Sequence, residues 1–309
     1  MNATIVFQQM VIMFMLMGLG FVLARRKVFS TKAPSDFSKL IIEVCNPVLM
    51  ISSALNRDGT ASKGDLLLAV LIAVIYFAVL IGLGKIIPRL ARVKKSEFKF
   101  YQLLGVYGNI GFMGIPLISA VLGTSAIIYL TVFIIMFNLL AYTHGVGVLT
   151  GDLQDAKSKF EWRRMVNHGT IAAAVSVVIY VADISLPTMI GQTLLYVGQC
   201  TTFISMAVIG MALAAIPAKE LFLEYKLYIF IALRFLLLPI VVALCLKPVL
   251  HNELLLGVTV ITLALPSANL PLMLAKQYGI KTDLFAKGIV LSTILSVVTV
   301  TVASWVVAL

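Results

Sequence analysis

Apolar segments long enough to cross a lipid bilayer recur along the whole chain, separated by short polar loops. An α-helix needs about 20 apolar residues to span the hydrocarbon core. Such segments lie at residues 5–24, 37–55, 65–87, 101–122, 125–148, 169–183, 189–215, 226–247, 253–277 and 284–307. The pattern therefore predicts an all-α polytopic membrane protein with ten transmembrane helices.

The composition indicates that lipid is the main solvent of the chain. Hydrophobic residues make up 61% of the sequence and charged residues only 12%, whereas a soluble domain carries roughly 25% charged residues. The first apolar segment is followed rather than preceded by basic residues, Arg25 to Lys27, which favours a retained span over a signal peptide. Cys45, Cys200 and Cys245 lie in apolar segments without the spacing of a metal site, so we expect neither a metal nor a cofactor.

The positions of the 24 basic residues predict the orientation of the chain. Only Arg57, Lys63 and Lys247 fall in loops after even-numbered spans, and one more, Arg234, lies within a span. The other 20 fall in the loops after odd-numbered spans. Because cytoplasmic loops are enriched in Lys and Arg, both termini are predicted outside the cytoplasmic membrane. The same distribution explains the net charge of +11 without a nucleic acid partner.

The ten spans divide into two halves of five. Residues 1–150 form the first five-helix repeat, 151–168 a cytoplasmic connecting loop, and 169–309 the second repeat. Because five is odd, the second half has the opposite orientation to the first. Inverted repeats are typical of secondary transporters, whose substrate sites lie near the middle of the bilayer.

Helix-breaking residues gather in spans four and nine, the fourth span of each half. The first break is Gly108-Asn109-Ile110-Gly111-Phe112-Met113-Gly114-Ile115-Pro116, and the second is Pro266-Ser267-Ala268-Asn269-Leu270-Pro271. A break in a helix leaves backbone N–H and C=O groups without their helical hydrogen bonds, and lipid offers no replacement partners. The positive amino ends of the half-helices favour an anion, and Asn109, Ser267 and Asn269 add neutral hydrogen-bonding groups. Proline kinks used only for packing are the alternative, but two breaks at matching places favour a crossover that binds a ligand.

Three groups of residues carry a family resemblance. They are Asn109 with Met113-Gly114-Ile115-Pro116-Leu117, Leu265-Pro266 with Pro271 and Ala275-Lys276-Gln277-Tyr278, and Arg234-Phe235-Leu236 with Pro239. This pattern resembles the auxin efflux carrier family, which includes the plant PIN carriers and bacterial malate and malonate permeases. The plant carriers have a long hydrophilic central loop, so the short loop here is similar to the prokaryotic type.

The resemblance implies a homodimer embedded in membrane lipid. Spans one, two, six and seven would form a scaffold, and spans three to five and eight to ten a moving transport domain. Span five lines the site in this family, which favours a ligand contact for Asn138 over a bond between helices alone. Tyr142, one turn further, is a weaker candidate on the same face. The predicted substrate contacts are Asn109, Gly114, Pro116, Asn138, Tyr142, Pro266, Ser267, Asn269 and Pro271.

Two charged residues lie inside predicted spans. Glu43 is about six residues, or ~9 Å, into span two, and Arg234 is about eight residues, or ~12 Å, into span eight, both from the cytoplasmic side. An unpaired charge at a helix centre costs about 2.5–3.5 kcal/mol, so the two residues form a candidate ion pair. The alternatives are a proton site or a solvated vestibule carboxylate for Glu43, and snorkelling to the interface for Arg234.

These features together predict an elevator-type secondary carrier for a small organic anion, in which the bound group is a carboxylate. The coupling ion stays open between a proton, sodium and none. One alternative is a sodium-coupled symporter of the bile-acid type, which has a similar architecture. An intramembrane enzyme is disfavoured, because the spans contain neither a nucleophile with a base nor a cluster of metal ligands. The chain also lacks a phosphate-binding loop for ATP.

Overall fold

The computed structural model describes residues 3–30, 32–55, 62–151, 166–214, 224–280 and 283–308. Within these ranges the chain is helical, and its extended segments pair only in an isolated antiparallel bridge between Gly108 and Ser267. Most of the predicted connecting loop 151–168 lies outside the described residues. So do seven of the basic residues used to predict orientation, namely Arg57, Lys157, Lys159, Arg163, Arg164, Lys219 and Lys281.

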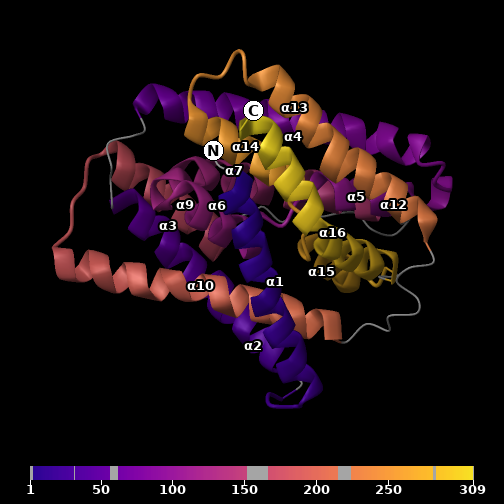
Figure 1. Ribbon diagram of the computed structural model, residues 1–309, viewed down its shortest axis with the longest axis horizontal. Coiled ribbons are helices and arrows are strands. Elements are labelled where there is room, and N and C mark those ends of the chain that lie inside the picture. The colour runs from indigo at the N-terminus through magenta and orange to yellow at the C-terminus, as the bar shows by residue number, and fades with distance from the viewer. Residues whose placement is uncertain are drawn as a thin grey trace.

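The described helices fall within or close to the predicted spans, and Figure 1 shows how they are arranged. In the first half they are α1 (Ala3–Arg25), α2 (Ala33–Leu40), η1 (Ile41–Cys45), α3 (Asn46–Leu55), α4 (Lys63–Leu90), η2 (Lys95–Glu97), α5 (Phe98–Val106), η3 (Ile110–Gly114), α6 (Ile115–Leu122), η4 (Thr124–Ala126), α7 (Ile127–Leu140), η5 (Ala141–Gly145) and α8 (Val146–Thr150). In the second half they are α9 (His168–Val181), α10 (Thr188–Ala214), α12 (Tyr225–Ile231), η7 (Ala232–Leu237), α13 (Leu238–Leu246), α14 (Glu253–Ala264), α15 (Leu270–Gln277) and α16 (Asp283–Ala308).

Seven of the described helical segments are long and apolar enough to cross a membrane. They are Thr4–Arg25, Ala33–Leu55, Gly64–Leu90, Thr124–Thr150, Thr188–Ala214, Tyr225–Leu246 and Asp283–Ala308. Three shorter apolar segments, Ile110–Leu122, His168–Val181 and Glu253–Ala264, fall within predicted spans four, six and nine. The prediction of an all-α polytopic membrane protein is confirmed, while the count of ten spans stays a prediction.

Two sets of packed helices are joined to each other by contacts between α7 and α9 and between α1 and α16. In one, α1 crosses α10, and α3 packs against both α10 and α9 (Figure 1). In the other, α4 packs against α5 and α7, while α14 packs against α13 and α16. Glycine permits the closest of these contacts, because a Cβ on Gly210 would lie 1.9 Å from the Met17 carbonyl oxygen. Small residues allow membrane helices to approach each other in this way.

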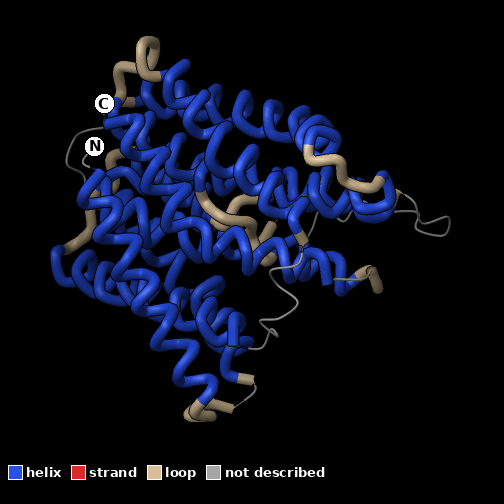
Figure 2. The backbone as a smooth tube through the Cα atoms, turned by 45° about the vertical axis from the view of Figure 1, so that its right-hand side comes forward, coloured by secondary structure: helices blue, strands red, loops and turns tan. Residues whose placement is uncertain are grey.

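The helices are interrupted by π-helical turns at η1, η3, η5 and η7. Such turns insert an extra residue, change the direction of the following side chains, and are frequent at functional sites. The N- and C-terminal ends lie close together in both views of the molecule (Figures 1 and 2). An even number of crossings would place the two ends on the same side of a membrane.

Candidate functional site

The two predicted breaks meet and hydrogen-bond to each other. Helix α5 ends before Tyr107, and α14 ends before Leu265. The Asn109 backbone N–H donates to the Pro266 carbonyl at 2.7 Å, and the Ala268 N–H donates to the Tyr107 carbonyl at 2.8 Å. Figure 2 shows loop segments enclosed by helices at the centre of the molecule. The unwound segments therefore run antiparallel and satisfy part of each other's backbone polarity, as burial in lipid requires.

Glycine and proline at the breaks have steric roles. A Cβ on Gly114 would lie 2.8 Å from Leu265 Cδ1, so a larger residue there would force the Leu265 side chain to move. Pro116 lies inside the continuous helical segment Ile110–Leu122, directly after the π-helical turn η3, so its missing N–H removes a helical hydrogen bond at that irregular turn. Pro266 is buried and accepts the bond from Asn109, and Pro271 is in the first turn of α15. The structure thus places these predicted site residues at the crossover.

Backbone carbonyls at the carboxyl end of α5 accept hydrogen bonds from side chains of other segments. The Ser267 hydroxyl donates to the Leu104 carbonyl at 2.9 Å, and Arg234 Nε donates to the Gly105 carbonyl. The Ser267 N–H donates in turn to Ser292 Oγ of α16 at 3.1 Å. Ser267 is fully buried, so its described hydrogen bonds hold the crossover together.

Backbone carbonyls at the carboxyl end of α14 accept hydrogen bonds in the same manner. Arg234 Nη1 donates to the Leu263 carbonyl at 2.8 Å, and Thr299 Oγ1 of α16 donates to the Ala264 carbonyl at 3.2 Å. One guanidinium therefore bonds to the carboxyl ends of both broken helices. The negative ends of the two helix dipoles are occupied by groups of the protein itself.

The amino ends of the second half-helices are more open. Asn109 Oδ1 caps the first of them by accepting from the Phe112 N–H at 3.3 Å, which leaves the Asn109 Nδ2 group without a hydrogen bond among the described residues. Asn269 lies just before α15, is half-buried, and makes no side-chain hydrogen bond to the described residues. Both asparagines can therefore donate to a ligand at the positive ends of these helices.

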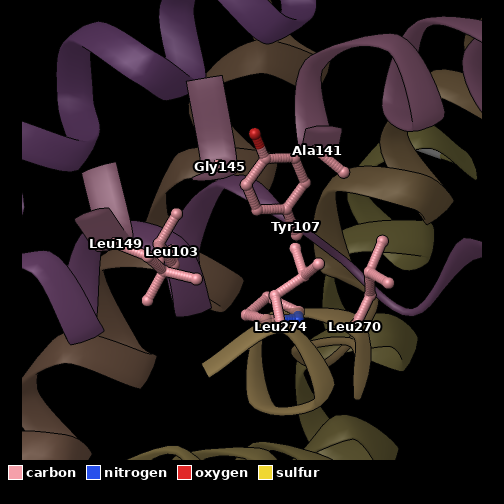
Figure 3. Close-up of a pocket in the computed structure, with 8 residues that line it drawn as sticks. Leu103, Tyr107, Ala141, Gly145, Leu149, Leu270 and Leu274 are labelled. Atoms are coloured by element: carbon pink, nitrogen blue, oxygen red, sulfur yellow. The ribbon is translucent and has the colours of Figure 1, made fainter. Parts of the chain in front are cut away.

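An apolar hollow lies beside the crossover (Figure 3). Tyr107 points between Gly145 and Ala141 in this view. The hollow is too tight to hold a water molecule. Its lining residues are Leu103, Tyr107, Ala141, Gly145, Leu149, Leu270, Pro271 and Leu274. Helices α5, η5 and α15 are thus packed closely against each other in this conformation.

Tyr107 anchors a polar network that the sequence did not reveal. Its hydroxyl donates to the Leu140 carbonyl at 2.7 Å and lies 3.1 Å from His144 Nδ1. His144 Nε2 lies 3.2 Å from Gln102 Nε2. Because the Tyr107 hydrogen is donated to Leu140, His144 donates from Nδ1 to Tyr107 and accepts from Gln102 at Nε2. A neutral histidine thus ties the crossover to η5.

Asn138 and Tyr142 lie on span five, as predicted. Their described contacts are with other parts of the protein than the two breaks. A Cβ on Gly169 of α9 would lie 3.7 Å from Asn138 Nδ2, so this amide lies at the contact between α7 and α9. Tyr142 is half-buried within η5 and packs against the hydrophobic core. Ligand contact stays a prediction for both residues.

The candidate ion pair between Glu43 and Arg234 is not formed in the part of the chain that the structure describes. Glu43 is exposed on η1, whereas Arg234 is only 1% exposed and bonds to backbone carbonyls. Its burial also excludes snorkelling, which requires the charged head to reach water. A proton role for Glu43 stays a prediction.

Asn46 is a further residue that sequence reasoning missed. Its Nδ2 donates to the Gly111 carbonyl at 3.3 Å, joining α3 to the first break. The side chain is 8% exposed, and its Oδ1 has no hydrogen-bond partner among the residues that the structure describes. The Asn46-Pro47 pair within an apolar span was the available signal, because both residues are uncommon in helix interiors.

A model of the family described as membrane transport protein matches residues 5–157 and 153–304. The chain belongs to this family, the auxin efflux carrier family. The matches cover nearly the whole chain and include both breaks, so the resemblance noted in the sequence is confirmed. This auxin efflux carrier family member is a multi-pass membrane transporter. A comparison with curated proteins finds no match.

Proposed function

We propose that this chain is a secondary carrier that moves a small organic anion across the cytoplasmic membrane, binding its carboxylate at the crossover. The observation that carries the proposal is the polarity of the two breaks. Their carboxyl ends are bonded to Ser267, Arg234 and Thr299, whereas the amide donors of Asn109 and Asn269 at their amino ends have no hydrogen bond to the described part of the chain. Donors at helix amino ends favour an anion over a cation.

The charge of the open ends suits a single carboxylate. Each helix amino end carries roughly half a positive charge, so two ends supply about one unit. A monocarboxylate balances that charge, and so does one carboxylate group of a dicarboxylate. We assign Asn109 and Asn269 as the donors, with Ser267 holding the crossover in shape.

The proposed architecture has ten spans in two inverted repeats, with both termini outside. The three shorter apolar segments complete the count of ten together with the seven long ones. The N- and C-terminal ends lie near each other in Figures 1 and 2, which supports an even number of membrane spans. In this arrangement 1–150 and 169–309 are the two repeats.

The proposed mechanism is an elevator movement within a homodimer. The group of α1, α3, α9 and α10 corresponds to a scaffold, and the groups around α5 and α14 correspond to a transport domain. The substrate site would then move with the crossover past the scaffold, giving access to each side of the membrane in turn.

Binding and flux measurements on the purified protein test this function. We expect mono- or dicarboxylates to raise the melting temperature in a saturable manner, because a ligand stabilises the state that binds it. Neutral amides of the same acids are the matched control and should have no effect. Counterflow of the same acid in vesicles should follow. Stabilisation by the neutral amides to the same extent would contradict an anion site.

The orientation is tested by labelling single cysteines from outside intact cells. In a background without Cys45, Cys200 and Cys245, a cysteine at exposed Lys94 should be protected from an impermeant maleimide. A cysteine at Ser185, in the loop after α9, should be labelled. Labelling at position 94 with protection at position 185 would reverse the proposed topology.

A further inference from the structure

Arg234 is a buried cation that donates hydrogen bonds to two backbone carbonyls and also interacts with the buried hydroxyl of Tyr76. It lies in the π-helical turn η7 and bonds to Gly105 and Leu263, each the residue before the last of a broken helix. Its guanidinium also lies 4.8 Å from the ring centre of Phe235. No carboxylate pairs with it among the described residues. The arginine therefore depends for its stability on the ends of two helices.

The positive charge of Arg234 is balanced by the partial negative charges of the two helix ends to which it bonds. A helix carboxyl end carries roughly half a negative charge, so the ends of α5 and α14 together supply about one negative unit. One guanidinium balances it. A buried charge is tolerated only when it is paired and its donors are satisfied. The two helix ends meet both needs for the bonded edge of Arg234, while Nη2 has no hydrogen-bond partner among the described residues.

We propose that Arg234 is the resident cation of the crossover, which fixes both broken helices in place and makes an exchangeable cation unnecessary there. The role of Arg234 in anion binding rests on the proposed function, whereas its role in holding the two helices does not. Arg234 acts as a positioning residue, since it holds α5 and α14 by their carboxyl ends while their continuations carry Asn109 and Asn269.

The hydrogen bonds that the helix-end carbonyls already accept explain why the cation at this place is an arginine side chain and not a bound ion. In transporters, sodium is commonly held by unwound carbonyls and helix carboxyl ends. Here four carbonyls at these two helix ends are already bonded to side chains, namely those of Leu104, Gly105, Leu263 and Ala264. A sodium ion at this place would have to displace Arg234 and would add an unbalanced charge. The anion affinity of the parent protein should therefore be the same in sodium and in choline salts.

Chemical rescue tests the proposal. Arg234→Ala removes the guanidinium and leaves a space of its size, so the melting temperature should fall below that of the parent. Millimolar methylguanidinium should refill the space and recover most of the loss in a saturable manner. Arg234→Met fills the same space with an apolar chain and should not respond. Arg89→Ala, at an exposed arginine, controls for general effects of the added cation.

The outcomes separate clearly. Rescue confined to Arg234→Ala supports the resident cation, whereas an Arg234→Ala protein that melts with the parent overturns it. Equal responses of the Ala and Met variants also overturn it. If Arg234→Ala yields no folded protein, Arg234→Lys replaces it, because a compact ammonium cannot reproduce the planar fork. That variant should melt below the parent, and equal melting would refute the proposal.

The readout by melting temperature needs no organic anion, so it stands even if the proposed substrate class is wrong. Anion binding is then measured in the rescued protein. Recovery of stability without any anion binding by the parent would contradict the proposed function alone. Sodium-dependent anion affinity in the parent would instead contradict the claim that the crossover needs no exchangeable cation.

Discussion

Replacing Asn109 by Ser is expected to weaken carboxylate binding about 10- to 150-fold without unfolding the protein. A hydrogen bond to a charged group contributes about 1.5–3 kcal/mol, and the shorter serine, whose one hydroxyl lies at the cap, has no second group in place of the amide N–H₂ that would donate it. Serine is nevertheless a good N-cap, so it can replace Asn109 Oδ1 as the acceptor for Phe112. The variant therefore separates the two roles of one side chain. Ligand titration followed by melting temperature measures both.

A matched control exists at the other end of α14. Asn252 caps that helix by accepting from the Leu255 N–H at 3.0 Å, and its Nδ2 donates to the Tyr129 hydroxyl. Asn252→Ser changes the same kind of residue about 18 Å from the crossover, counted along the helix. It should leave carboxylate affinity unchanged. Asn109→Ala should lose the cap as well as the donor and so lower the ligand-free melting temperature further. Parental affinity in Asn109→Ser would refute the assignment of this site.

The sequence was sufficient to predict the helices and the two breaks. Hydrophobic segments determine where a chain crosses lipid, because exposed backbone polarity there is so costly. Gly108, Asn109 and Pro266 interrupt such segments with residues that disfavour a regular helix. The structure unwinds the chain at both places and joins the two breaks by hydrogen bonds.

The partners of the polar residues could not be predicted in the same way. The spans are apolar on nearly all sides, so periodicity does not reveal which face of a helix points toward protein. Arg234 bonds to carbonyls of Gly105 and Leu263, and a backbone carbonyl leaves no signal in the residue type. Asn138 turns toward α9, a direction that depends on how α7 is rotated about its axis.

The π-helical turns are a second reason why the partners of polar residues could not be predicted from the sequence. Each extra residue rotates the side chains that follow it by about 100° around the helix axis, and four segments contain such a turn. The Tyr107 and His144 contact depends on the turn at η5, which lies 37 residues away in sequence. Only the folded chain reveals this pairing.

Joining α3 to the first break by a disulfide is expected to abolish transport while leaving carboxylate binding intact. If α3 belongs to the scaffold and η3 to the transport domain, the bond from Asn46 to Gly111 must break during each cycle. A Cβ on Gly111 would lie 3.6 Å from Asn46 Nδ2, so the side chains at these two positions are neighbours, and bond formation between cysteines there is checked by mass before flux is measured. The pair is made in a background without the three native cysteines.

The matched control joins two helices that should move together. A Cβ on Gly84 of α4 would lie 3.0 Å from Gln102 Cγ of α5, the place that a cysteine sulfur would take. Flux is measured for both pairs after oxidation and again after reduction, with bond formation verified by mass. Oxidation should stop flux only in the pair at 46 and 111, and a reductant should restore it. Full flux with that bond closed would exclude any movement of the crossover past α3, and with it the elevator mechanism.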